Sequence, residues 1–423
     1  MRAGYTREII NPYYPCKMEG YNEARFCFNQ TAEQKAASNQ GLRTAYGQRD
    51  DLLMDVLCME SNQKIVFFQL DICIVEEEFI QFCKEELCKQ FELKPEQISI
   101  ACSHTHNSPV VSHGMAYDLK PDLKYWNLIR KKMIFALSEV LENMETVSVY
   151  LDRHVIQGYY NNRNRPNDEH YKFCDEIIIK GLDDKPIVRV LNLACHPTIL
   201  GAQNKLVTAD FFGVLRRALQ GYNGMPIMIW NGEAGDSSPR LLKKGVDWNE
   251  CIRYGTGIAA QLIDENHLIK VEISNIDIKE IVHVVDYNPK ENQYLQQQQK
   301  KLNLELKELD PSSDRYNRIK TCYLYDVDEK LSKDHLHYEM RSYIYDFGVF
   351  RVVCVPCEID TVLGAKIRNA DDKVTYLCSY SNGFNYYAVN SEEYGIVFES
   401  FNTYFPYGSA DEMVDNIIKS FHD

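Results

Sequence analysis

Short apolar segments of strand length recur along the whole chain and alternate with segments of helical periodicity, which limits the folds available to it. β-Branched and apolar residues mark the strand-like segments, at 52–59, 64–72, 98–103, 147–156, 176–179, 186–195, 226–230, 271–285, 343–355 and 374–380. Apolar residues three and four apart mark the helical segments, at 76–91, 122–142, 210–219, 249–264, 289–308 and 410–421. This alternation is typical of α/β proteins, in which helices cover β-sheets.

Two long strand-like segments, 147–156 and 271–285, have no helical segment beside them. We therefore predict mixed β-sheets that pack together and are flanked by α-helices, rather than one purely parallel sheet. Because the sequence shows neither an internal repeat nor a linker rich in Pro, Gly or Ser, we predict a single domain over residues 1–423. Its polar segment 286–337 is predicted to be a helical insertion, either a solvated helix pair or a lid.

The charge and hydropathy of the chain exclude several function classes. The net charge of −14, without a dense cluster of Lys and Arg, argues against nucleic-acid binding and against adsorption to anionic membranes. No run of about 18 apolar residues is present, and the N-terminal segment lacks the apolar stretch of a signal peptide. We therefore predict a cytoplasmic protein with no stable membrane insertion and a small-molecule ligand. The sequence makes no prediction about the oligomeric state of the protein.

Four strand-like segments end abruptly in polar residues with Gly or Pro. They are ISIACSHTHNSP (98–109), VLNLACHPTILG (190–201), MIWNGEAGDSSPR (228–240) and VVCVPCEIDT (352–361). In α/β proteins ligands collect at strand ends, because side chains from several strands converge there. These segments are the candidate site-forming regions.

Three histidines follow strand-like segments in this way. His104 and His106 are two residues apart, so in an extended chain they point to the same side, and His196 has a matching context. A single histidine of this kind is more often a hydrogen-bonded core residue, but three together indicate a metal site, and imidazole is a common zinc ligand. Glu358 is a candidate anionic ligand. It is also placed to be a carboxylate at a helix N-terminus, and the two roles are compatible.

The segment NGEAGDSSPR offers Asp236 and Ser238 beside two glycines that permit a tight turn. Ser238 is a candidate nucleophile, a candidate hydrogen-bond donor to a transition state, or a turn cap, and the spacing alone favours the turn cap. The segment matches neither the GxSxG elbow nor a phosphate-binding loop.

Taken in order, these segments resemble the catalytic domain of the neutral/alkaline ceramidase family. The resemblance is carried by SHTHNSP, NNRNRP (161–166), ACHPT, TADFFG (208–213), GEAGDSSPR, VPCE and SNGFNYYAVNSEEY (381–394). It implies one zinc ion held by four residues, His104, His196, Glu358 and Tyr387. It further implies that His106 is the acid/base group, that Arg165 lies near the substrate carbonyl, and that Ser238 matches the serine of the family's GDxSP segment.

The chain departs from the family in two places. Phe398–Glu399–Ser400 stands where the family has Tyr-Glu-Gly, and a phenyl ring cannot donate a hydrogen bond to a developing oxyanion. Tyr386 and Tyr394 are candidate replacements, and with Asp236 they are the candidate substrate-binding residues. The chain also ends soon after Tyr394, so we expect no C-terminal immunoglobulin-like domain.

The leading hypothesis is a zinc-dependent hydrolase that cleaves a linear amide in an N-acyl or lipid-like compound by a metal-activated water. His106 would carry the proton, and Arg165 and Ser238 would stabilise the oxyanion. One alternative is an ester- or serine-type hydrolase in which Ser238 attacks. Another is a metal-containing binding protein without turnover.

Overall fold

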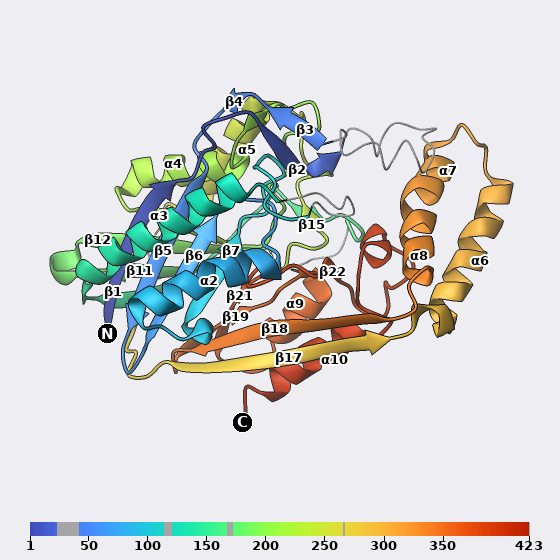
Figure 1. Ribbon diagram of the computed structural model, residues 1–423. Helices are drawn as coiled ribbons and strands as arrows, with labels where there is room; N and C mark the ends of the chain where they lie inside the picture. The colour runs from blue at the N-terminus through green and yellow to red at the C-terminus, as the bar shows by residue number, and fades with distance from the viewer. Residues whose placement is uncertain (23–41, 114–120, 167–171, 265–266, 423) are drawn as a thin grey trace.

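The computed structural model describes residues 1–22, 42–113, 121–166, 172–264 and 267–422, and three β-sheets form its centre (Figure 1). Mixed sheets flanked by helices confirm the predicted fold class. The first sheet has the order β7 (Ile98–Cys102), β6 (Lys64–Leu70), β5 (Leu53–Glu60), β1 (Arg2–Ile9), β8 (Glu145–Thr146). The second has the order β14 (Ile227–Asn231), β12 (Pro186–Leu193), β11 (Phe173–Lys180), β9 (Ser148–Val155), β16 (Ile269–Val271). The third has the order β17 (Asp277–Tyr287), β18 (Leu336–Asp346), β19 (Phe350–Cys354), β21 (Val374–Cys378).

Each large sheet contains one parallel pair, and the other pairs are antiparallel. The parallel pairs are β6 with β7, β12 with β14, and β19 with β21. Side chains from all three sheets share one buried core, to which Leu57, Val190 and Val352 each contribute. The sheets therefore pack on one another, which brings the ends of their strands together.

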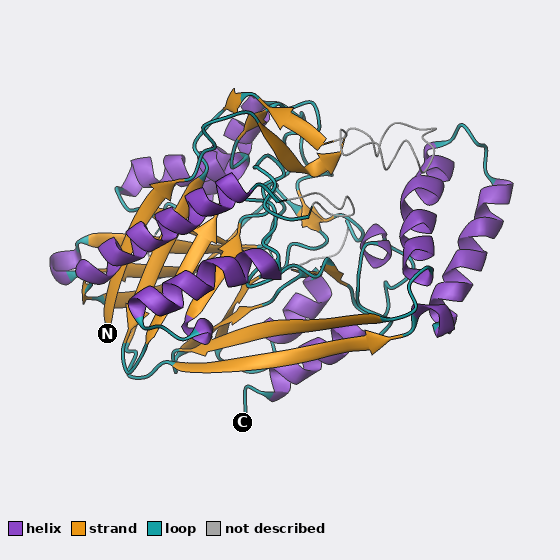
Figure 2. Ribbon diagram, viewed as in Figure 1, coloured by secondary structure: helices purple, strands orange, loops and turns teal. Residues whose placement is uncertain are grey.

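Helices cover the outer faces of the sheets (Figure 2). The first sheet is covered by α2 (Glu77–Phe91) and α3 (Leu123–Glu142), the second by α4 (Phe211–Asn223) and α5 (Trp248–Gln261), and the third by α9 (Thr361–Arg368) and α10 (Ser409–Lys419). In α3, the side chains of Tyr125, Ile129, Met133 and Leu137 are spaced four apart and are all buried. Asp122 caps this helix by accepting from two backbone N–H groups of its first turn.

The structure divides two segments that the sequence pattern joined. Residues 271–285 contain the last residue of β16 and most of β17, and residues 343–355 contain the end of β18 and all of β19. Gly348 has φ +82° and lies in the turn between β18 and β19, where Asp346 accepts its backbone N–H. The sequence pattern did not predict strand β1, because its charged residues interrupt the alternation of apolar and polar residues. One of them, Arg7, is held by Asp55 of β5.

Helices also fill the segment 286–337, between β17 and β18. They are η5 (Pro289–Glu291), α6 (Gln293–Glu308), α7 (Asp314–Arg318), the π-helical turn η6 (Ile319–Tyr323) and α8 (Leu324–Leu331). Figure 1 shows α6 and α8 side by side, away from the three sheets. A small apolar cluster that includes Leu302, Tyr323, Val327 and Phe401 ties these helices to the rest of the chain.

Short strand pairs and turns complete the described structure. The pairs are β2 (Cys16–Asn22) with β3 (Leu42–Ala45), β4 (Gly47–Gln48) with β13 (Leu206–Val207), β10 (Asn161–Asn162) with β15 (Ser237–Ser238), and β20 (Glu358–Ile359) with β22 (Tyr387–Ala388). The 3₁₀ turns are η3 (Pro95–Gln97), η4 (Leu182–Asp184) and η7 (Phe398–Phe401). Across the described ranges, no helix combines the length and apolar character that crossing a membrane requires.

Candidate metal centre

His104, His196 and Glu358 converge from three different sheets. His104 follows β7, His196 follows β12, and Glu358 begins β20 just after β19. The Nε2 atoms of His104 and His196 lie 3.3 and 3.1 Å from Glu358 Oε2. All three side chains are buried. Three strand ends that are distant in sequence therefore present two imidazoles and one carboxylate to a single point.

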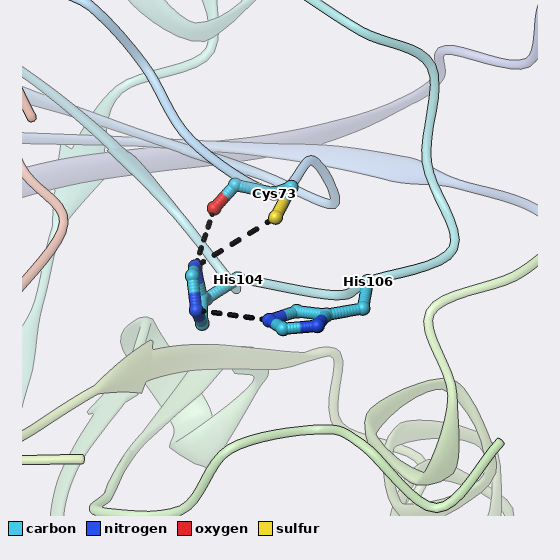
Figure 3. A group of neighbouring side chains, drawn as sticks. All are labelled: Cys73, His104 and His106. Carbon is cyan, nitrogen blue, oxygen red and sulfur yellow. Dashed lines mark hydrogen bonds between the residues drawn. The ribbon is translucent and has the colours of Figure 1, made fainter. Parts of the chain in front are cut away.

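Backbone carbonyls fix the direction of both imidazoles. Nδ1 of His104 lies 2.7 Å from the Cys73 carbonyl oxygen (Figure 3), and Nδ1 of His196 lies 3.1 Å from the Ser237 carbonyl oxygen. A carbonyl can only accept, so each Nδ1 carries the proton and each Nε2 lone pair is directed at the cluster. This is the arrangement in which protein histidines bind metals.

The local charge state also fits a metal ion. Burial lowers the pKa of His196 to about 4, which keeps the ring neutral near pH 7, as a ligand must be. Burial alone would raise the pKa of Glu358, but positive charge on the adjacent His104 and His196 rings would hold that pKa well below the ordinary value. With both rings neutral, a bound cation would supply that positive charge. Among the described residues, Glu358 Oε1 is buried without a hydrogen-bond partner. A cation would satisfy that oxygen, and two nitrogens with one carboxylate oxygen suit zinc.

His106 reaches the same cluster from the neighbouring position. Its Nε2 lies 3.1 Å from His104 Nε2 (Figure 3), and its Nδ1 has no hydrogen-bond partner among the described residues. The ring is held by the paired strands β2 and β3, where Tyr21 makes an edge contact and Arg43 donates to the His106 carbonyl. Burial and the nearby imidazoles of His104 and His196 place the pKa of His106 well below its usual value. His106 is thus a neutral ring able to accept a proton.

Tyr387 and Arg163 lie beside Glu358. Tyr387 is the partner of Glu358 across the β20–β22 pair, and its hydroxyl oxygen accepts from Arg163 at 3.3 Å. Arg163 also donates to the Gly235 carbonyl and pairs with Glu399. Burial and the negative charge of Glu358 raise the pKa of Tyr387. The structure therefore places Tyr387, the fourth predicted zinc ligand, next to Glu358 in the β20–β22 pair.

Comparison with known proteins gives results only at the level of structure. No protein-family model matches the chain, and no curated protein matches its sequence. The neutral ceramidase from Pseudomonas aeruginosa is similar, with a TM-score of 0.72 and 13% identity over 99% of this chain and 73% of that one. A structure described as ceramidase complexed with C2 gives 0.71 and 14% over 99% and 74%. The chain has the neutral ceramidase fold. At this identity the similarity shows the fold alone.

On this ceramidase-like fold, Arg163 contacts Tyr387, whereas the resemblance named Arg165 as the arginine near the substrate carbonyl. Arg165 pairs with Glu393 at 2.7 Å and leaves about a third of its side chain exposed (31%), whereas Arg163 is buried and touches Tyr387. Both arginines lie in NNRNRP, where Asn162 accepts the backbone N–H groups of residues 164 and 165 and forms a turn. Sequence reasoning missed Arg163 because nothing in the motif shows which arginine the turn directs inward.

The residues of GEAGDSSPR support the site indirectly. Ser238 lies in β15, and its hydroxyl oxygen accepts the Arg240 N–H at 3.3 Å, as a turn cap does. The adjacent Ser237 provides the carbonyl that orients His196. Asp236 is buried and accepts from the backbone and hydroxyl of Thr361 and from the Asn162 amide. Asp236 therefore joins three segments of the fold.

The two candidate tyrosines have different surroundings. Tyr394 donates its hydroxyl to the Phe405 carbonyl inside a small aromatic cluster. The Tyr386 carbonyl accepts the Glu358 N–H at 2.8 Å, and the Tyr386 side chain lines a cavity. Phe398, which stands where the family has tyrosine, has its ring centroid 6.2 Å from that of Tyr387.

Proposed function

We propose that this protein is a zinc-dependent hydrolase that cleaves a linear amide bond in an N-acyl or lipid-like compound. The observation that carries the proposal is the convergence of His104, His196 and Glu358, with both histidines oriented by backbone carbonyls. The fold supports it, because the similar solved structures are described as ceramidases.

The residues that would hold the ion are His104, His196 and Glu358, with the Tyr387 hydroxyl as the fourth ligand. Zinc supplies Lewis acidity, which lowers the pKa of a water towards about 7 and polarises a carbonyl oxygen. The carboxylate balances part of the charge of the ion, and burial of the cluster strengthens that attraction.

His106 is the proposed proton carrier. Its neutral ring accepts one proton as the water oxygen bonds to the amide carbon, and it returns that proton to the nitrogen as the carbon–nitrogen bond breaks. Arg163 keeps its positive charge beside Tyr387, where it can stabilise the negative charge on the former carbonyl oxygen. We assign to Arg163 the role that the resemblance gave to Arg165.

A serine-type mechanism has less support. A nucleophilic serine needs a base within hydrogen-bond reach. The Ser238 hydroxyl accepts the backbone N–H of Arg240 in its own turn, and the Nδ1 atoms of His104 and His196 hydrogen-bond to backbone carbonyls.

The test is elemental analysis of protein purified without chelator, together with hydrolysis assays on N-acyl compounds. We expect about one zinc per chain from the four ligands. A His196→Ala variant should lose zinc and activity together, and the surface variant His335→Ala should keep both. Full activity in His196→Ala, or the absence of stoichiometric zinc from active protein, would contradict the proposal.

A further inference from the structure

The helical insertion, residues 286–337, contacts the rest of the chain close to the candidate metal centre. In η6, the Tyr323 ring stacks on the Phe401 ring with centroids 4.2 Å apart, and it lies 6.4 Å from the Phe398 ring. Tyr323 is only 3% exposed, and it shares one buried apolar cluster with Phe401. Phe398 and Phe401 are the first and last residues of η7. The insertion therefore packs against both ends of that short turn.

Helix α6 of the insertion makes a second contact, with the loop that precedes η7. The Tyr294 hydroxyl donates to the Tyr394 carbonyl at 2.8 Å and accepts from the Gln298 amide at 2.7 Å. The Tyr294 ring also stacks on the Tyr407 ring, with centroids 5.3 Å apart. Gly395 permits this approach, because its φ is +79° and a Cβ on it would collide with the Tyr294 hydroxyl. Helix α6 and the loop are therefore held at one close distance.

The same turn, η7, holds groups beside the candidate metal centre. Glu399 forms a buried ion pair with Arg163 at 2.5 Å and accepts from the Asn164 amide at 2.9 Å. Asn402 directly follows η7, and its carbonyl accepts the backbone N–H of Tyr387 at 3.2 Å. Since Arg163 donates to the Tyr387 hydroxyl, η7 is connected to Tyr387 both through the backbone and through Arg163.

The position of η7 depends on what packs against it. A 3₁₀ turn of four residues has little stability of its own, because its hydrogen bonds are poorly aligned, and no side chain caps the start of η7. Its carboxylate at Glu399 is 1% exposed, so it is stable only where Arg163 can pair with it. A shift of η7 would therefore move Arg163 or break a buried ion pair.

We propose that the insertion is a brace, in which Tyr294 and Tyr323 are positioning residues that hold η7 and, through it, Arg163 and Tyr387. The kinetic consequence rests on the proposed amide hydrolysis at the metal centre. The sequence allowed two interpretations of this segment, a solvated helix pair or a lid. The two aromatic contacts support neither of them, because they join the insertion to η7 and its loop in a fixed arrangement.

The first experiment measures kcat and KM of the zinc-loaded protein on an N-acyl amide that the wild type cleaves, starting with N-dodecanoylethanolamine. We expect Tyr323→Leu to lower kcat by about 10- to 100-fold with zinc retained and KM within about twofold of wild type, because a misplaced catalytic group slows the chemical step. Tyr294→Phe removes one hydrogen bond and should lower kcat by about threefold to tenfold. The control is Leu304→Ala, at a position of α6 that is 61% exposed, and it should change neither constant.

A double-mutant cycle tests whether Tyr323 acts through Arg163, because a general loss of stability also lowers activity. In an Arg163→Lys background, Tyr323→Leu should lower kcat by less than about threefold, since the group that it positions is already altered. Equal fold-losses in the two backgrounds would contradict the proposal and would assign to Tyr323 a role in the fold alone.

Hydrogen exchange of the Tyr387 backbone N–H, followed by NMR, needs no turnover and separates this proposal from the proposed function. Because that N–H is bonded to the Asn402 carbonyl, Tyr323→Leu should accelerate its exchange by about tenfold, and Leu304→Ala should not. If exchange accelerates in this way and the wild type cleaves no amide, hydrolysis is refuted and the brace is supported.

Two other outcomes would refute the brace. If amides are cleaved and Tyr323→Leu changes neither kcat nor the exchange of the Tyr387 N–H, the brace is wrong and hydrolysis stands. If exchange accelerates while kcat stays at the wild-type value, η7 moves without displacing the groups at the metal centre, and Tyr323 is not a positioning residue.

Discussion

Two clusters in this protein contain the same ligand types in opposite surroundings. His104, His196 and Glu358 are buried, whereas Asp286, His335 and His337 lie at the exposed ends of β17 and β18. In the exposed cluster His337 Nδ1 lies 3.0 Å from Asp286, and His335 lies 3.5 Å from the same carboxylate. The distances are close to those of the buried cluster, and about half of each exposed side chain is in contact with solvent.

The difference lies in what holds each side chain. Both buried histidines donate Nδ1–H to a backbone carbonyl, and the Glu358 backbone is paired with Tyr386. In the exposed cluster the ring contacts are with Asp286 and between the two histidines. Ligand type alone therefore does not define a metal site, because a preorganised ligand set loses less entropy when it binds.

The largest effect should come from removing the carboxylate of the buried cluster, compared with the same change in the exposed cluster. Glu358→Gln takes the anion from between two imidazoles, so we expect zinc to be lost and kcat/KM to fall by about 10³-fold or more, equivalent to about 4 kcal/mol. Asp286→Asn should change neither. Elemental analysis and a hydrolysis assay measure both effects, and equal loss in the two variants would remove the distinction between the clusters.

A second comparison uses the two arginines of NNRNRP. Arg163→Lys should lower kcat by about 10²-fold, because a lysine cannot contact Tyr387, Gly235 and Glu399 at once. Arg165→Lys keeps the charge of a partly exposed pair with Glu393 and should cost less than about threefold. Steady-state kinetics measure kcat for both variants. A larger loss of kcat in Arg165→Lys than in Arg163→Lys would assign stabilisation of the oxyanion to Arg165.

The buried carboxyl of Glu19 should make stability depend on pH, whereas exposed carboxyls should not. Burial raises the pKa of Glu19 from 4.5 to about 8, and Ser112 donates to it. Between these values the folded state holds a proton that the unfolded state releases, so the free energy of unfolding falls as pH rises. We expect Glu19→Gln to remove about 2 kcal/mol of this fall between pH 6 and pH 8. Urea unfolding at both pH values measures the change, and Glu85→Gln, at an exposed position of α2, is the control, with no change expected.

The smallest effect tests how strand β2 holds His106. Gly20 has φ +89°, and a Cβ there would lie 2.4 Å from His106 Cγ. Gly20→Ala should displace the ring and lower kcat by about tenfold with zinc retained. Gly158→Ala is matched in backbone strain, with φ +81°, but its Cβ would meet nothing within 4 Å. If both variants lose activity equally, backbone strain and not displacement of His106 is the cause.

Local pattern was enough to predict most of the elements and the segments that form the site. Strand β7 and helix α3 have uniform apolar periodicity, and the structure has them within one residue of the predicted range. Strand β1 was missed, because its polar residues are satisfied by partners that the sequence does not show, as Arg7 is by Asp55. A pattern of this kind reports burial along one element, and it cannot report a partner from another element.

The same division applies to the site. The sequence by itself determined that imidazoles and a carboxylate follow buried strands, because a strand end is visible in local composition. Only the tertiary structure decided that His104, His196 and Glu358 meet while Asp286, His335 and His337 stay at the surface, and that Arg163 rather than Arg165 points inward. The physical reason is that orientation depends on hydrogen bonds from distant segments, such as those of the Cys73 and Ser237 carbonyls.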